Sequence, residues 1–198
     1  MNHEKKGILL AMALSFLLVQ SAWANLVVNG DFATGNTTGW TFTAAASGSD
    51  FFVGAIPIGG AVTGGYDSDP SAANFGAMGA LDDTLSQVIS TVAGQAYTFT
   101  FFLAHDSTNT ANDFSAYWNG TAVLSLLNTA TFDWTEYSYT ETATGATTDI
   151  TFAGREVFAW YDLDAVSVDP TTVPLPGTVV LLGSGLLLLL GWRRMQQV

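Results

Sequence analysis

The middle of this 198-residue chain alternates apolar and polar residues with a period of two, and it contains no amphipathic stretch long enough for a ten-residue helix. The clearest case is the segment 96–103, where threonines alternate with aromatic residues. Such alternation is typical of strands that bury one face. Many short strands separated by Gly-containing turns favour an all-β domain, either a β-sandwich or a jelly roll.

The same reading predicts the positions of the strands. Asn119-Gly120 predicts a tight hairpin turn, because both residues accept a positive φ. The expected strands cover 26–28, 40–43, 51–58, 85–90, 96–103, 114–118, 121–127, 134–142, 148–152 and 158–168.

The N-terminus has the three-part layout of a secretory signal peptide. Lys5 and Lys6 precede an apolar run over 8–19, and Ala22-Trp23-Ala24 forms a small-x-small cleavage site. A first transmembrane helix is the alternative, but the run is too short for a bilayer core of about 30 Å. We therefore expect a signal peptide over 1–24 and export through the Sec pathway.

The C-terminus carries a second apolar segment. A Pro-containing linker over 170–177 leads into a Leu-rich stretch over 178–192, and a basic tail over 193–198 follows. This order predicts a short transmembrane helix with the tail in the cytoplasm and the preceding domain outside. A plain C-terminal anchor is the alternative to a processed sorting signal.

The C-terminal segment resembles a PEP-CTERM sorting signal. The matching residues are Val173, Pro174, Leu175, Pro176 and Gly177, followed after the apolar stretch by Arg193 and Arg194. Leu175 stands where many members of that family have Glu. The resemblance implies recognition and cleavage by an exosortase in a Gram-negative bacterium. It also implies a protein held first at the inner membrane and then placed at the cell surface or in the exopolysaccharide matrix of a biofilm.

The segment between the two ends is strongly acidic. Over 25–172 it has sixteen Asp and Glu residues against one base, Arg155, which gives a formal net charge of −15. Such a surface repels phosphate backbones, so we expect no nucleic-acid partner. The chain has no Cys, which excludes disulfides, a cysteine nucleophile and thiolate metal sites. Divalent cations would relieve the self-repulsion.

Residues 25–169 resemble galactose-binding-like jelly-roll domains and related carbohydrate-binding modules. The resemblance rests on the opening Asn-Leu-Val-Val-Asn-Gly-Asp-Phe at 25–32 and on the closing Leu-Asp-Ala-Val-Ser-Val at 163–168. It implies a structural Ca²⁺ held by Asp31 and Asp164, and Asp162 shares a strand face with Asp164. Ala33 and Ala165 stand where related modules often have carboxylates. Calcium takes six to eight oxygen ligands, so these two replacements remove ligands from the implied site.

Aromatic residues are the best candidates for ligand binding. A flat ring can stack on the C–H face of a sugar while neighbouring polar groups bond its hydroxyls. We expect Trp40 and Trp118 to belong to the core. The predicted sugar contacts are Tyr66, Trp134 and Tyr161, with Tyr161 as the exposed member of the adjacent pair Trp160-Tyr161.

These features favour an exported, non-catalytic protein that binds extracellular polysaccharide or acts as a structural element of the matrix. One alternative is a small glycan hydrolase or lyase that uses Asp82, Asp83 or Asp106. A third possibility is a self-associating adhesion module, because Gly- and Thr-rich strands can pair edge to edge. His105 is the one His beyond the signal peptide, which excludes a multi-histidine metal site within one chain.

Overall fold

A computed structural model describes residues 25–55, 65–67, 70–106 and 111–171 of the chain. The predicted signal peptide, linker motif, transmembrane helix and basic tail lie outside these residues. The described residues contain no helix of the length and apolar character that a membrane crossing requires.

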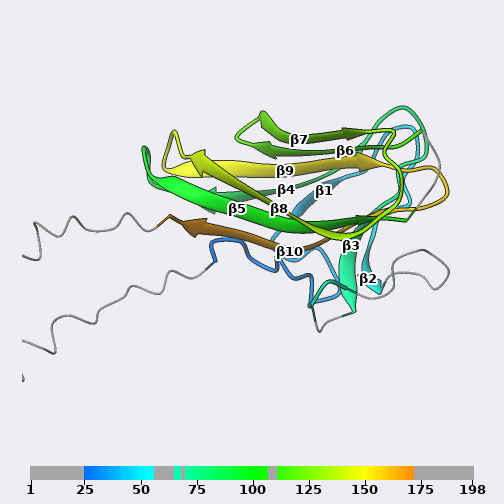
Figure 1. Ribbon diagram of the computed structural model, residues 1–198, viewed down its shortest axis with the longest axis horizontal. Helices are drawn as coiled ribbons and strands as arrows, with labels where there is room; N and C mark the ends of the chain where they lie inside the picture. The colour runs from blue at the N-terminus through cyan, green and yellow to red at the C-terminus, as the bar shows by residue number, and fades with distance from the viewer. Residues whose placement is uncertain (1–24, 56–64, 68–69, 107–110, 172–198) are drawn as a thin grey trace, which may run out of the picture.

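The described residues form a β-sandwich of two five-stranded antiparallel sheets, as the alternation predicts (Figure 1). Sheet A has the order β1(Thr41–Thr43), β4(Asp83–Ser90), β9(Thr147–Arg155), β6(Asp113–Trp118), β7(Thr121–Leu127). Sheet B has the order β2(Phe52–Ala55), β3(Ser71–Phe75), β10(Tyr161–Pro170), β5(Ala96–His105), β8(Phe132–Thr142). Strand β10 is therefore the central strand of sheet B, and both of its neighbours are far away in the sequence.

Aromatic side chains from both sheets fill the space between them. The Phe101 ring from β5 meets the Phe152 ring from β9 edge-on, with centroids 5.1 Å apart. Phe75 from β3 meets Phe114 from β6 in the same way at 5.5 Å. Edge-to-face pairs of this kind add to the stabilisation that burial of the rings provides.

The two tryptophans predicted to be structural lie in this core. Trp40 is 7% exposed and Trp118 is 4% exposed. The Trp40 indole N–H donates to the carbonyl of Asn29 at 3.0 Å, so this ring also fixes the N-terminal segment against the core.

The predicted Asn119-Gly120 turn is confirmed. Both residues have a positive φ, 48° and 80°, and they join β6 to β7. The positive φ values are those that a tight hairpin turn requires, and Asn and Gly are the residues that reach them at least cost.

The predicted strand over 26–28 is wrong. The Gln87 side chain donates to the carbonyl of Val28 and accepts from its N–H, at 3.0 and 2.8 Å. Asn25 Oδ1 accepts from the N–H of Val27 and from that of Val168, both at 2.9 Å. Side chains thus replace the backbone partners of Val27 and Val28, while the N–H of Leu26 donates to the carbonyl of Val168 at 3.0 Å.

Strand β3, Ser71–Phe75, was not predicted. Its sequence Ser-Ala-Ala-Asn-Phe lacks β-branched residues and has one aromatic, so it carries little intrinsic strand signal. Its neighbours explain its small side chains: β3 lies between β2 and β10, and Ala72 packs under Trp134.

Candidate functional site

The side of sheet B that faces away from sheet A carries the candidate site, which we call the outer face. Along β10, Tyr161 and Leu163 point into the core, so Asp162 and Asp164 point to the outer face. A small second cluster forms on this face, where Trp134 of β8 packs against Ala72 and Ala104. The outer face therefore carries two small alanines, the Trp134 ring, and the carboxylates of Asp162 and Asp164.

Tyr66 lies over this face. Its ring stacks on Phe102 of β5 with centroids 3.4 Å apart and an interplanar angle of 15°. It meets Trp134 edge-on, with centroids at 6.2 Å and an angle of 67°. Tyr66 remains 44% exposed. The structure thus brings together two of the three predicted sugar contacts, and Phe102 supports one of them from below.

Asp164 holds the backbone of Tyr66 in this position. Its Oδ2 accepts from the N–H of Tyr66 at 2.8 Å, and its Oδ1 accepts from the N–H of Ala165 at 2.7 Å. Burial raises the pKa of Asp164 to about 7, the charges of Asp67 and Asp31 add to the rise, and the two backbone hydrogen bonds oppose it.

Asp162 lies two residues earlier on the same face and is completely buried. Burial raises its pKa well above 3.8, and the charge of Asp106 adds to the rise. Among the described residues, neither of its carboxylate oxygens has a hydrogen-bond partner.

The prediction for Tyr161 as a sugar contact needs correction, because its ring is fully buried. It stacks on His105 with centroids 4.2 Å apart. Its hydroxyl donates to Asn112 Oδ1 at 2.6 Å and lies 2.7 Å from Thr129 Oγ1. Adjacent residues in a strand face opposite ways, as expected, but Trp160 is the more accessible member of the pair.

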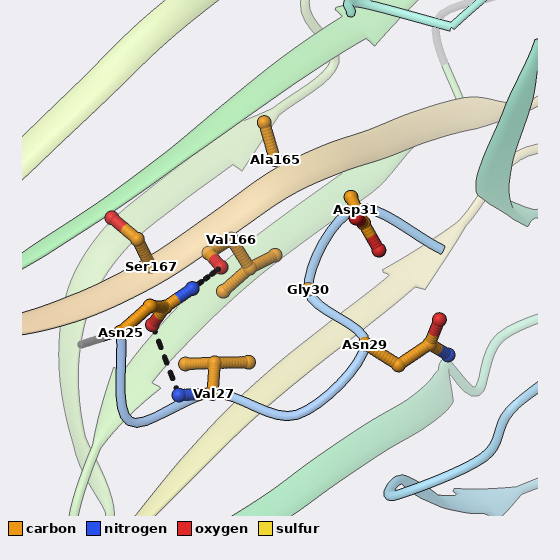
Figure 2. Close-up of a pocket in the computed structure, with 8 residues that line it drawn as sticks. All are labelled: Asn25, Val27, Asn29, Gly30, Asp31, Ala165, Val166 and Ser167. Atoms are coloured by element: carbon orange, nitrogen blue, oxygen red, sulfur yellow. Dashed lines mark hydrogen bonds between the residues drawn. The ribbon is translucent and has the colours of Figure 1, made fainter. Parts of the chain in front are cut away.

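The predicted calcium ligands Asp31, Asp162 and Asp164 do not form one metal-binding group. Among the described residues, the structure shows no group of three or more Asp, Glu or His side chains placed to hold a metal ion. Asp31 is exposed and lines a pocket of about 290 Å³ between the N-terminal segment and β10 (Figure 2). Of the eight residues that line this pocket, Asp31 alone carries a carboxylate, and Ala165 lies where a second could have been.

The acidic residues considered for catalysis lie in two places. Asp82 accepts from the Arg155 guanidinium at 2.6 Å beside sheet A. Asp83 is buried, and its Oδ1 accepts from the N–H of Ala45 at 2.9 Å. Asp106 follows the end of β5 in sheet B, where its N–H donates to the carbonyl of Trp160 at 3.3 Å.

Sequence reasoning missed two residues of the outer face, Phe102 and Asn74. Phe102 had a readable signal, since it follows Phe101 in a strand and adjacent residues face opposite ways. Asn74 lies in the unpredicted strand β3, so nothing in the sequence placed it beside Asp162.

Solved structures with a similar fold include a galactotriose-bound protein, an adhesin domain and a xylan-binding domain. TmCBM61, solved in complex with β-1,4-galactotriose, has a TM-score of 0.57 and 16% identity, with 74% of this chain and 99% of that chain covered. The K3 cleaved adhesin domain of Lys-gingipain from Porphyromonas gingivalis has a TM-score of 0.53 and 20% identity, with 74% and 99% covered. The CBM22-1 xylan-binding domain of Xyn10C from Paenibacillus barcinonensis has a TM-score of 0.51 and 14% identity, with 79% and 100% covered.

No protein-family model matches the sequence, and no curated protein matches it significantly. The likeness to solved structures therefore establishes the architecture. The domain has the jelly-roll β-sandwich fold found in carbohydrate-binding modules, as the sequence resemblance predicted.

Proposed function

We propose that this domain is a non-catalytic polysaccharide-binding module that holds its glycan on the outer face of sheet B, against Tyr66 and Trp134. The observation that carries the proposal is the exposed Tyr66 ring, which stacks on Phe102 and meets Trp134 at a steep angle. A ring held firmly on one side loses little freedom when a sugar stacks on its other side, which lowers the entropy cost of binding.

Asp164 supports the site from beneath. It is 0% exposed and accepts from the N–H of Tyr66 at 2.8 Å, so it positions Tyr66 and does not itself contact the glycan. The carbohydrate-binding modules that share the fold support this choice of ligand class.

The delivery signals expected from the sequence support an extracellular location for this function. We propose that the signal peptide directs export, and that an exosortase processes the chain at the motif around Val173 and Pro176. The product then resides at the surface or in the matrix of the cell that makes it. Mass spectrometry of the surface form would find a C-terminus near Pro176. A tail that extends to Val198 would instead indicate a plain anchor.

A panel of immobilised polysaccharides, including the producer's own exopolysaccharide, tests the binding function. We expect retention on at least one glycan and no release of reducing ends. Release of reducing ends would contradict the non-catalytic proposal and favour a hydrolase. Sedimentation of the protein alone, with no glycan retained, would favour the adhesion module.

A further inference from the structure

Two buried side chains on neighbouring strands of the outer face have oxygen acceptors without hydrogen-bond partners in the described structure. Asp162 of β10 and Asn74 of β3 are direct partners in the antiparallel register. Both are 0% exposed. Within the part of the chain that the structure describes, Asn74 Oδ1 and both carboxylate oxygens of Asp162 lack a hydrogen-bond partner.

The orientation of the Asn74 amide follows from its own hydrogen bonds. Its Nδ2 donates to the carbonyl of Ala72 at 2.8 Å and approaches those of Phe52 and Gly54 at 3.4 Å. Phe52 and Gly54 belong to β2, on the side of β3 away from β10. Because the amide is planar, with oxygen and nitrogen on opposite sides, Oδ1 points toward β10 and Asp162.

The described chain offers no cation to neutralise this group. Arg155 is the single base over 25–172. Its guanidinium is engaged beside sheet A, with Asp82 at 2.6 Å and Asp113 at 3.5 Å. A buried carboxylate without a charge partner or donor is among the most costly arrangements in a protein. Whatever offsets this carboxylate, a cation or a proton, must therefore come from solution.

We propose that a divalent cation of the calcium class binds between Asp162 and Asn74, with Asp106 as a further carboxylate ligand. Asp106 directly follows His105, whose ring stacks on the core residue Tyr161, and continuing the β5 alternation by one residue beyond the strand end puts Asp106 on the outer face. Its charge acts on Asp162, which agrees with this placement. Two carboxylates and one amide oxygen supply up to five oxygens, and water completes the six to eight that calcium takes. The site is separate from the Asp31 pocket of Figure 2, and it lies on the same outer face as the proposed glycan contacts, since Asp162 pairs with Ala104, which packs against Trp134.

A bound proton is the alternative to a bound cation, since a neutral Asp162 could donate to Asn74 Oδ1. A site filled by a cation and a site filled by a proton differ in how the stability of the protein responds to calcium. A ligand that binds only the folded state raises its stability with each increase in concentration, so a filled site predicts a calcium-dependent Tm that EGTA reverses. A shared proton predicts a Tm that ignores calcium and depends on pH.

The experiment compares calcium titration and thermal unfolding of the full chain, held in detergent, with those of three variants. We expect the unmodified chain to bind calcium and to lose that binding in Asp162→Asn. The matched control Asp31→Asn, an exposed aspartate at the other pocket, should keep it. Asn74→Ala provides a second test if Asp162→Asn does not fold, and it should weaken calcium binding. Glycan retention, measured on the same samples, shows whether calcium binding and glycan binding are lost independently of each other.

Three results would overturn the inference. The first is an unmodified chain whose Tm and calorimetric trace do not respond to calcium. The second is calcium binding that survives Asp162→Asn or Asn74→Ala with affinity unchanged. The third is binding that disappears in Asp31→Asn and persists in Asp162→Asn, which would place the ion in the Figure 2 pocket.

Discussion

The backbone N–H of Tyr66 donates a 2.8 Å hydrogen bond to the Asp164 carboxylate, and this contact fixes an aromatic loop to the central strand of sheet B. Asp164 and Phe102 are partners in the register of β10 and β5. One residue of the pair thus holds the Tyr66 backbone while the other supports its ring. The position of the exposed ring is set by the sheet beneath it.

The raised pKa of Asp164 predicts a pH-dependent stability. Its pKa in the folded state is about 7, above the ordinary 3.8, so the folded state binds the proton more tightly than the unfolded state does. This contribution to the free energy of unfolding is complete below about pH 4 and disappears as the pH rises through about 7. The variant Asp164→Asn lacks it.

Urea unfolding in EGTA at several pH values checks this prediction. Between about pH 4 and about pH 7, the free energy of unfolding should fall more steeply in the unmodified chain than in Asp164→Asn. Asp162 contributes a slope of the same sign to both proteins, so it cancels in the comparison. Parallel pH profiles for the two proteins would contradict the prediction.

The hydroxyl of Tyr161 is predicted to stabilise the fold without taking part in glycan binding. Tyr161→Phe removes its hydrogen bonds to Asn112 and Thr129 and leaves the ring in place. Asn112 Oδ1 still accepts from the N–H and the hydroxyl of Thr129, so the loss is that of the two tyrosine hydroxyl hydrogen bonds and should lower the free energy of unfolding by about 1–3 kcal/mol. Urea unfolding measures the loss, and glycan retention should stay unchanged. A loss of glycan binding in a folded Tyr161→Phe protein would restore the sequence-based assignment of this residue.

Part of the fold could be predicted because its signals are local. The alternation over 96–103 marks a strand by itself, and Asn119-Gly120 marks a turn through the φ values that its residues tolerate. The segment 26–28 was mispredicted because its partners come from elsewhere in the chain. The side chain of Gln87, which is 59 positions from Val28 in the sequence, takes the place of the expected strand neighbour at Val28.

The candidate site was only partly predictable for the same reason. Tyr66 and Trp134 were both selected as aromatic residues, but their contact depends on the order of strands in sheet B. Tyr161 was assigned to the wrong surface, since alternation shows that it and Trp160 face opposite ways without showing which faces the core. The Asp162–Asn74 pairing needs the register of β10 on β3, which no local pattern encodes.

Gly30 is predicted to be essential for packing of the N-terminal segment. A Cβ at this position would lie 2.1 Å from the carbonyl oxygen of Val166, and the Gly30 carbonyl accepts from the N–H of the same residue at 2.8 Å. Gly30→Ala must push the segment away from β10, at a cost of about 1–3 kcal/mol or more.

Gly145→Ala is the matched control, because its Cβ would meet atoms at ordinary distances of 3.6 and 3.9 Å. Thermal unfolding of both variants should show a clear loss of Tm for Gly30→Ala and a small change for Gly145→Ala. Equal Tm values for the two variants would refute the close approach of Gly30 to β10.

The most direct test of the central claim is the affinity of Tyr66→Ala and Trp134→Ala for the polysaccharide that retains the unmodified chain. Phe158→Ala is the control, since Phe158 is 90% exposed and no glycan contact is assigned to it. Truncation of a central binding residue costs about 2 kcal/mol or more, so isothermal titration should show a large loss for the first two variants and an unchanged affinity for the control. Full affinity in Tyr66→Ala and Trp134→Ala, with both proteins folded, would contradict a glycan site on the outer face of sheet B.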